Sequence, residues 1–320
     1  MDAALQRLLK QTSRSFYLSI RILPAAIRPQ IGLAYLLARA TDTVADTGGL
    51  PVVLRREALC RMQAAIAAAA EGRALPAPRL EAPAAMLGPA EKQLLRSFGT
   101  ILASVLRLPD ADRSQIGRVL ATITSGQALD LARFGNAGGQ SMAALSTDEE
   151  LDDYIQRVAG CVGEFWTRIC RSHLFPDAPL DEAALLSNGV RFGKGLQLVN
   201  ILRDLPRDLR QGRCYIPRVL LEGRGLSPED LLDHAAMDPF RLLYEDYLDK
   251  AGVQLEAGRA YIMALPRRHV RVRLACLWPL MIGRKTIELL RAGNVLNSNL
   301  SIKVSRSDLT WIMLSSLRHL

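Results

Sequence analysis

Two pairs of aspartates constrain the fold of this chain more than any other feature of its sequence. Asp42 and Asp46 form one pair, Asp204 and Asp208 form the other, and the members of each pair are four residues apart. Residues at this spacing lie on one face of a helix. Each pair follows a segment too apolar for a helix whose acids simply face water. The sequence therefore predicts two helices that each present a double-carboxylate face to the protein interior.

One such pair alone carries little information. With 32 acidic residues among 320, chance gives about three acid pairs at this spacing, most of them on solvated helix faces. A solvated helix face is therefore the plain alternative for either pair taken separately.

The rest of the chain also favours helices. Hydrophobic residues make up 49% of the sequence and aromatic residues only 5%, and alternating β-branched segments bounded by tight turns are nearly absent. Helices are expected over residues 25–47, 90–108 and 112–134, with a proline-rich loop at residues 75–89. Thr147 and Glu150 form a capping-box pattern that begins another helix. We expect an all-α protein with one domain over residues 1–320.

Charge and cysteine content narrow the class of partner. The net charge of +9 favours phosphates or a membrane surface, so a peripheral membrane contact is among the expected partners. The basic residues are interpreted as scattered, which argues against nucleic acid. Five cysteines without a Cys-x-x-Cys motif are typical of free thiols in the cytoplasm. Neither a signal peptide nor a membrane-spanning segment is expected.

The acid pairs indicate a metal-diphosphate site. Two carboxylate faces brought together would repel each other unless cations lay between them. Mg²⁺ suits such a site because it takes a few carboxylate oxygens and completes its shell with water and phosphate, and Mn²⁺ is the substitute. Asn200 precedes Asp204 by one turn, where its amide oxygen could join the metal shell; a satisfied buried amide is the alternative. The predicted metal ligands are Asp42, Asp46, Asn200, Asp204 and Asp208.

Several ordered motifs resemble the squalene/phytoene synthase family, the head-to-head prenyl diphosphate synthases. They are Ser13-Arg14-Ser15-Phe16, the segment from Tyr35 to Asp46, Tyr154-x-x-x-Val158-Ala159-Gly160-x-Val162-Gly163, Gln197-x-x-Asn200-x-x-Arg203-Asp204-x-x-x-Asp208, Gly212-Arg213-x-Tyr215-x-Pro217 and Lys303-Val304-Ser305-Arg306. Within the family, residues 38–46 look more like the squalene synthase form than the phytoene synthase form.

The resemblance implies an isoprenoid-synthase-type helical bundle around a central channel. It also implies that two farnesyl diphosphates join to presqualene diphosphate, which is ionised again, rearranged and reduced by NADPH to squalene. Phytoene, dehydrosqualene or hydroxysqualene, formed without the reductive step, are the alternative products.

Roles for individual residues follow from the resemblance and from side-chain chemistry. Diphosphate binding is expected of Ser13, Arg14, Ser15, Arg39, Gln197, Arg203 and Arg213; catalysis of Tyr35, Tyr154 and Arg203; channel lining of Phe16, Leu37, Val158 and Val162; and NADPH binding of Lys303 and Arg306. Surface ion pairs are the alternative for the arginines, and a paired core hydroxyl is the alternative for the tyrosines.

Three features depart from these expectations. Pro206 lies between Asp204 and Asp208, where it would kink a helix; the kink would move Asp208 off the shared face, or it is what turns Asp208 toward the metal. Ala45 stands where the squalene branch often carries a third acid. A Gly-x-Gly-x-x-Gly element after a strand is missing, so NADPH would not be held in the Rossmann manner.

Overall fold

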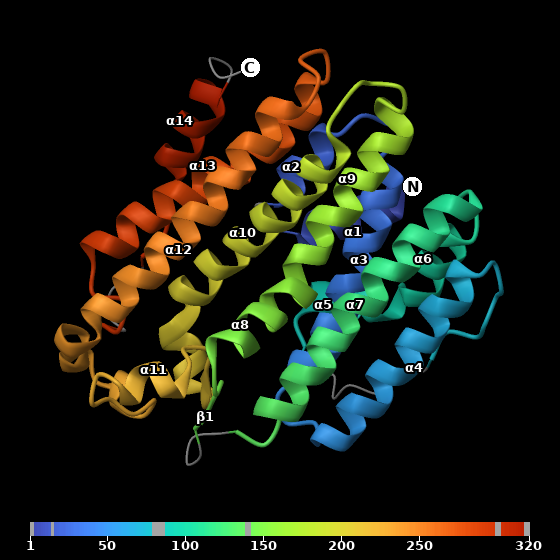
Figure 1. Cartoon of the computed structure of the whole chain (residues 1–320). Helices are drawn as coiled ribbons and strands as arrows, with labels where there is room; N and C mark the ends of the chain where they lie inside the picture. Colours follow the sequence, from blue (N-terminus) through green and yellow to red (C-terminus); the bar gives the residue numbers. More distant parts are fainter. Residues whose placement is uncertain (1–2, 14–15, 79–86, 138–141, 298–301, 317–320) are drawn as a thin grey trace. The chain divides into compact units, whose positions relative to one another are not determined.

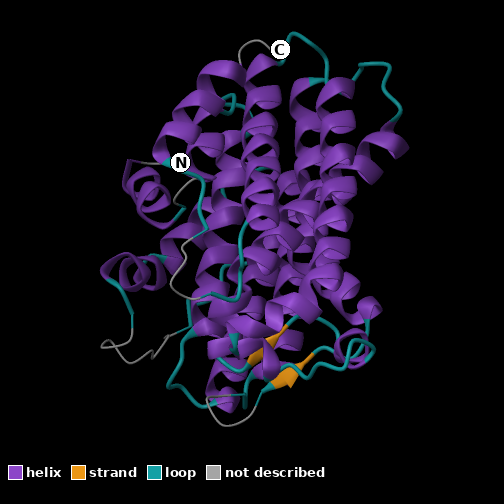
Figure 2. Cartoon of the chain, turned by 90° about the vertical axis from the view of Figure 1, so that its left-hand side faces the viewer, coloured by secondary structure: helices purple, strands orange, loops and turns teal. Residues whose placement is uncertain are grey.

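The computed structural model describes residues 3–13, 16–78, 87–137, 142–297 and 302–316. Helices form nearly all the regular structure of these residues, and two short strands complete it (Figure 2). The predicted all-α class is therefore confirmed.

The chain divides into two compact units. Unit 1 comprises Met1–Leu131 and Glu164–Pro179, and unit 2 comprises Ala132–Gly163 and Leu180–Leu320. Each unit has its own buried apolar core. The single domain over residues 1–320 and the channel at its centre stay predictions.

Unit 1 is built from the first helices of the chain. They are α1 (Ala3–Thr12), α2 (Phe16–Ile22), α3 (Arg28–Asp46), α4 (Val52–Ala70), α5 (Pro89–Arg96), α6 (Phe98–Val105), most of α7 (Asp110–Phe134) and the later part of α9 (Cys161–Leu174). Leu36 of α3, Met62 of α4 and Ile101 of α6 are completely buried in its core.

The predicted helices of unit 1 are confirmed with one exception. Residues 25–47 and 112–134 correspond to α3 and α7. Residues 90–108 do not form one helix, because the chain bends at Ser97 between α5 and α6. The Ser97 N–H is shared between the carbonyls of Gln93 and Leu94, at 3.0 and 3.1 Å, which tightens the end of α5 and breaks its hydrogen-bond register.

Unit 2 contains the longest helices. Its elements are strand β1 (Ala143–Ala144), α8 (Asp148–Ile155), a π-helical turn (Gln156–Gly160), the start of α9, α10 (Glu182–Arg210), strand β2 (Arg213–Cys214), α11 (Arg218–Glu222), two 3₁₀ turns (Asp230–Leu232 and His234–Ala236), α12 (Met237–Ala264), α13 (Val270–Ala292) and α14 (Arg306–Ser316). Helices α10, α12 and α13 run side by side (Figure 1). The strands pair in parallel, Ala143 with Arg213 and Ala144 with Cys214.

The predicted cap at Thr147 is confirmed, with one change of partner. The Thr147 hydroxyl accepts the Glu150 N–H at 3.4 Å. The Glu150 carboxylate reaches back to the N–H of Ser146, at 2.7 Å, rather than to that of Thr147. The two side chains therefore satisfy two backbone N–H groups at the start of α8, those of Ser146 and Glu150.

Glycines allow α10 to approach the π-helical turn and the start of α9. A Cβ added to Gly193 would clash with the Ala159 carbonyl oxygen, and one added to Gly163 would clash with the Gly189 carbonyl oxygen. These backbones touch where no side chain fits, so contact between helices explains both glycines.

Membrane crossing is a separate question. Among the residues that the structure describes, no helix combines the length and the apolar character needed to span a bilayer.

Candidate active site

The first acid pair lies in the last turns of α3, in unit 1. Asp42 keeps 40% of its side chain exposed, and its Oδ2 accepts a hydrogen bond from Arg39 Nη1 at 2.6 Å. Asp46, the last residue of the helix, is exposed. Arg55 Nη1 donates to the Ala45 carbonyl at 2.9 Å, which satisfies one of the open carbonyls at this helix end.

The environment of Asp42 disfavours its charged form. Desolvation, followed by the carboxylate of Asp46, raises the pKa of Asp42 to about 7, although Arg39 opposes the shift. Asp130 of α7 adds a smaller contribution of the same sign as Asp46. A cation bound here would relieve this unfavourable charge, and the exposed part of Asp42 leaves room for it to arrive from solution.

Asp130 is a residue that sequence reasoning missed. It is 88 positions beyond Asp42, and it comes near because Leu131 of α7 packs against Ala45 of α3 in one cluster. Its position among the apolar residues 128–132 resembles that of the two aspartate pairs, and this is the signal that could have identified it.

The second acid pair lies in the last turns of α10, in unit 2. Arg203 contacts the Asp204 carboxylate through two nitrogens, with Nε to Oδ1 at 2.8 Å and Nη2 to Oδ2 at 3.0 Å. Arg207 Nη2 lies 3.5 Å from Asp204 Oδ2 and 3.3 Å from Asp208 Oδ1. One guanidinium therefore reaches both carboxylates, which places the two aspartates on the same side of the helix.

Pro206 does not interrupt this arrangement. Helix α10 continues through Pro206 to Arg210, and the contacts of Arg207 with both carboxylates remove the doubt that Pro206 raised about the position of Asp208. A proline has no N–H to give to the carbonyl four residues earlier, here that of Leu202. The Tyr244 hydroxyl of α12 donates to this carbonyl at 3.2 Å instead. A tertiary hydrogen bond thus replaces the missing helical one.

Asp208 is the most buried of the four aspartates, with 11% of its side chain exposed. Burial raises its pKa to about 6, and the carboxylate of Asp204 acts in the same direction. Arg207 and, more weakly, Arg213 act in the opposite direction. Arg213 comes near because Gly212, with φ of 77°, turns the chain back after α10. Sequence reasoning selected Arg213 as a diphosphate ligand but not Arg207.

Gln197 and Asn200 extend the polar face of α10. Positions 197, 200, 204 and 208 follow one another at three or four residues and so share one side of the helix. Both amides are half-buried, and neither side chain is hydrogen-bonded to a described residue. Within that part of the chain, the alternative of a satisfied buried amide is not observed for Asn200.

These donor sets suit Mg²⁺. Each pair offers carboxylate oxygens from one helix face and leaves the remaining coordination positions to water and phosphate. Among the described residues, no three acidic, histidine or cysteine side chains gather into a complete metal site. The carboxylate oxygens of each pair suit a Mg²⁺ ion that keeps coordination positions for other ligands.

The two predicted catalytic tyrosines have different surroundings. The hydroxyl of Tyr35 donates to the Thr12 carbonyl at 3.1 Å, and its ring lies 5.5 Å from that of Phe16. This is the paired hydroxyl that the sequence left open as the alternative. Tyr154 stacks on Tyr215 with ring centroids 5.0 Å apart, and the two hydroxyl oxygens are 3.5 Å apart.

The remaining predicted site residues fall into three groups. Ser13 is buried and donates its hydroxyl to the Leu9 carbonyl, whereas Arg14 and Ser15 lie outside the described residues. Leu37 is buried in the core of unit 1, and Val158 and Val162 are half-buried in unit 2. Lys303 and Arg306 are exposed at the start of α14.

Comparison with known proteins connects this geometry to a family. The family model for squalene/phytoene synthase matches residues 9–308. The squalene synthase of Schizosaccharomyces pombe is 31% identical over 209 residues, which cover 65% of this chain and 42% of that protein. The bifunctional lycopene cyclase/phytoene synthase of Sporisorium reilianum is 26% identical over 258 residues, which cover 67% of this chain and 36% of that protein. The match thus spans less than half the length of either relative.

A solved structure agrees over a longer stretch. The ligand complex of TcSQS superposes with a TM-score of 0.81 at 22% identity, covering 98% of this chain and 86% of that one. This likeness shows that the helices share the isoprenoid synthase arrangement. Because the family model covers nearly the whole sequence, the chain belongs to the squalene/phytoene synthase family.

Proposed function

We propose that this chain is a squalene synthase, a farnesyl-diphosphate farnesyltransferase. It would join two farnesyl diphosphates head to head into presqualene diphosphate with Mg²⁺, and then reduce that intermediate with NADPH to squalene. Family membership supports the condensation. The squalene synthase of S. pombe, at 31% identity, supports the choice of product.

The observation that carries the proposal is the last part of α10. There Asp204 and Asp208 share one face with Gln197 and Asn200, and the guanidinium of Arg207 spans both carboxylates. Carboxylates for a metal and donors for a phosphate are thus combined on one helix. Such a combination suits a step in which a diphosphate departs.

A bound Mg²⁺ would neutralise the charge that develops on the departing diphosphate. Asp42 and Asp46 would hold metal from α3, and Asp204, Asp208 and Asn200 would hold it from α10. The raised pKa values of Asp42 and Asp208, about 7 and about 6, support this assignment, because burial and a neighbouring carboxylate disfavour the charged form of each, and a bound cation would offset both effects.

Arg39, Arg203 and Arg213 would bind the diphosphate. Arg39 and Arg203 pair with aspartates at 2.6 and 2.8 Å, so each guanidinium already lies beside a carboxylate assigned to the metal. Once a cation takes the carboxylate, the guanidinium is available to the phosphate oxygens that the same cation binds. Gln197 would add an amide donor.

Tyr154 would accept or relay the proton lost when the cyclopropane ring closes. As Tyr154 takes up this proton on its hydroxyl oxygen, its own O–H proton would pass through the Tyr215 hydroxyl, 3.5 Å away, to the diphosphate that the reaction releases, which is the final base. Tyr35 is less suited, since its hydroxyl already donates to the Thr12 carbonyl.

NADPH would supply the hydride for the second half of the reaction. Lys303 and Arg306 are the proposed contacts for its phosphates. Both are exposed, and neither forms an ion pair with another described residue. The cytoplasmic location expected from the cysteine content stays a prediction.

The alternative function omits the reductant and gives phytoene, dehydrosqualene or hydroxysqualene. The similarity to the bifunctional lycopene cyclase/phytoene synthase of S. reilianum supports keeping this alternative.

Product analysis decides between the two functions. The purified chain is incubated with Mg²⁺ and either farnesyl or geranylgeranyl diphosphate, with and without NADPH, and the products are separated by gas chromatography after dephosphorylation. Squalene formed only with NADPH, and presqualene alcohol without it, supports the proposal. The same hydrocarbon in both samples rules out the reductive step, and a product only from geranylgeranyl diphosphate identifies a phytoene synthase.

A further inference from the structure

The basic surplus of this chain is concentrated at its C-terminal end. Residues 257–320 contain eleven arginines and lysines but only two acids, Glu288 and Asp308. They therefore carry all of the net charge of +9, and residues 1–256, with 30 basic and 30 acidic residues, are neutral. The basic residues themselves are spread along the chain, as the sequence interpretation had it, but the acids are nearly missing from residues 257–320, so the net charge is localised there.

The connection between α12 and α13 presents arginines to solvent. Arg267, Arg268 and Arg271 are all exposed there. Arg273 is buried instead and donates to the Leu265 carbonyl at 3.0 Å, which fixes the start of α13 against the end of α12. Arg267 forms no ion pair with any described residue. The exposed arginines are thus held on an ordered turn.

Helix α14 adds large apolar side chains near the same end of unit 2. The Trp278 Nε1–H of α13 donates to Ser316 Oγ at 3.0 Å, so the end of α14 lies beside the first half of α13. Ile312 is buried in this contact, whereas Trp311 and Leu314 are each 66% exposed. Met263 at the end of α12 is 58% exposed, and Val270 at the start of α13 is 41% exposed.

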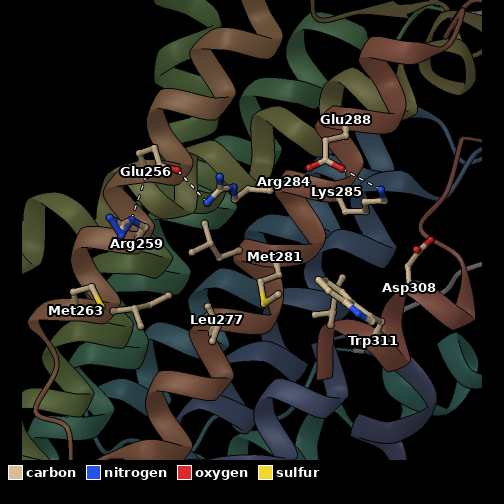
Figure 3. Close-up of a pocket in the computed structure, with 13 residues that line it drawn as sticks. Glu256, Arg259, Met263, Leu277, Met281, Arg284, Lys285, Glu288, Asp308 and Trp311 are labelled. Atoms are coloured by element: carbon tan, nitrogen blue, oxygen red, sulfur yellow. Dashed lines mark hydrogen bonds and ion pairs between the residues drawn. The ribbon is translucent and has the colours of Figure 1, made fainter. Parts of the chain in front are cut away.

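Met263, Trp311 and Ile312 contribute to the lining of a groove of about 960 Å³. Figure 3 shows Met263 and Trp311 on opposite sides of it, with Leu277 and Met281 between them. The polar residues farther along the groove are paired, Arg284 with Glu256 at 3.4 Å and Lys285 with Glu288 at 3.1 Å. Net positive charge is therefore contributed by the α12–α13 connection, and apolar surface by the groove and its rims.

We propose that this C-terminal surface, made of Arg267, Arg268, Arg271, Met263, Val270, Trp311 and Leu314, docks on an anionic lipid bilayer. Arginines near an anionic membrane surface attract it, and Trp and Leu gain free energy by entering the headgroup region. A nucleic acid would use the arginines but would leave the four large apolar side chains in water. The combination of charge and apolar surface therefore favours lipid.

Vesicle flotation tests the proposal with the full chain, without substrate or metal, so the result does not depend on the proposed reaction. Vesicles of equal parts phosphatidylglycerol and phosphatidylcholine should bind the protein, and vesicles of phosphatidylcholine alone should not. The triple variant R267Q/R268Q/R271Q should bind the anionic vesicles on the order of 100-fold more weakly, because each arginine near the surface contributes about fivefold. The variant W311A/L314A should bind about tenfold more weakly.

Two controls separate docking from general charge and from misfolding. The variant R56Q/R61Q/R118Q removes three exposed arginines from the neutral part of the chain and should bind like the parent protein. The variant W311F should still bind, but it should lose the blue shift of tryptophan fluorescence on vesicle addition. Circular dichroism should be unchanged throughout, since every altered side chain is exposed.

Several results would overturn the proposal. They are failure of the parent protein to float with anionic vesicles, equal flotation of the parent and both surface variants, and a fluorescence shift that persists in W311F. Salt-sensitive binding to duplex DNA that depends on the three arginines, without vesicle binding, would assign the surface to nucleic acid instead.

Discussion

Both acid pairs lie in the last turns of a long helix, but the two helices differ in the basic residues that accompany the acids. The last turn of α3 contains no basic residue, whereas the last turn of α10 contains Arg207 and Arg210. A helix C-terminus carries partial negative charge, so acids there are unfavourable unless cations accompany them. Helix α10 supplies its own cations, and α3 has Arg39, one turn before Asp42.

The two helices therefore differ in how they compensate the charge of a proposed metal-binding face when no metal is bound. The second pair is neutralised by neighbouring arginines and is mostly buried, with 26% of the Asp204 side chain and 11% of the Asp208 side chain exposed. The first pair is more open, with Asp42 at 40%, and more dependent on an incoming cation. If both pairs hold metal as proposed, the arginines compensate the charge of the second pair before the metal binds, whereas the charge of the first pair is compensated mainly by the metal itself.

The largest expected effect tests whether both pairs hold metal despite this difference. Asp42→Asn and Asp204→Asn should each reduce turnover at least ~100-fold, because each removes a carboxylate that would carry the cation at the leaving diphosphate. Steady-state rates with farnesyl diphosphate, measured across Mg²⁺ concentrations, check this. Asp246→Asn, which alters an acid on α12 whose side chain is 71% exposed, is the control and should leave the rate unchanged. Parent-level activity in only one of the two variants would assign the metal to the other pair alone.

The two tyrosines extend the comparison to proton transfer. Tyr154→Phe should lower the rate of cyclopropane formation about 10- to 100-fold, at or below the low end of the range for a general base, because the Tyr215 hydroxyl 3.5 Å away can take over part of the role. Tyr35→Phe should stay within about threefold of the parent, since its hydroxyl is engaged with the Thr12 carbonyl. Single-turnover measurement of presqualene diphosphate distinguishes them. A larger loss in Tyr35→Phe would move the proton-transfer role to unit 1.

Part of this picture was accessible from sequence and part was not. The spacing of Asp42 with Asp46, and of Asp204 with Asp208, is local, so helical periodicity was enough to place each pair on one face. The approach of Asp130 to Asp42 and the stacking of Tyr215 on Tyr154 depend on residues that are 88 and 61 positions apart. Tertiary packing alone brings such residues together. The way in which α10 accommodates Pro206 was inaccessible for the same reason, because the group that satisfies the Leu202 carbonyl comes from α12.

The packing that holds α10 can be tested on its glycines. Gly193→Ala should destabilise the fold by about 1–3 kcal/mol, because its Cβ would clash with the Ala159 carbonyl oxygen and neither backbone can give way. Gly252→Ala on α12 is the matched control. Apart from the neighbouring residues and the nearby backbone of α12 itself, nothing lies within 4 Å of its added Cβ, so it should stabilise the helix by up to about 1 kcal/mol. Thermal unfolding measures both, and equal melting temperatures would show that α10 does not need this close contact.

The Tyr244 hydroxyl should stabilise the fold because Pro206 leaves the Leu202 carbonyl without its helical hydrogen bond. Tyr244→Phe should cost about 1–3 kcal/mol of stability, the penalty for a buried acceptor that loses its hydrogen bond. In a Pro206→Ala background the helical N–H returns to the Leu202 carbonyl, so the same change should cost less. Chemical denaturation of the four proteins gives the coupling between the two positions. If the stability changes of Tyr244→Phe and Pro206→Ala simply add, the Tyr244 hydroxyl does not take the place of the missing helical N–H.

Arg207 gives the smallest effect and the most direct test of how the second pair is prepared. Its guanidinium lies 3.5 and 3.3 Å from the two carboxylates, with 60% of its side chain exposed, so it competes with a cation only weakly. Arg207→Gln should lower the Mg²⁺ concentration needed for half-maximal rate about threefold while changing the maximal rate little. Arg210→Gln, in the same turn but without an ion pair to a described aspartate, should leave that concentration unchanged. If Arg207→Gln instead raises the Mg²⁺ concentration needed for half-maximal rate, the arginine helps to bind the metal–diphosphate complex and does not replace the metal as a partner of the carboxylates. The two acid pairs would then differ in how they bind the cation, and not in how their charge is compensated before the cation binds.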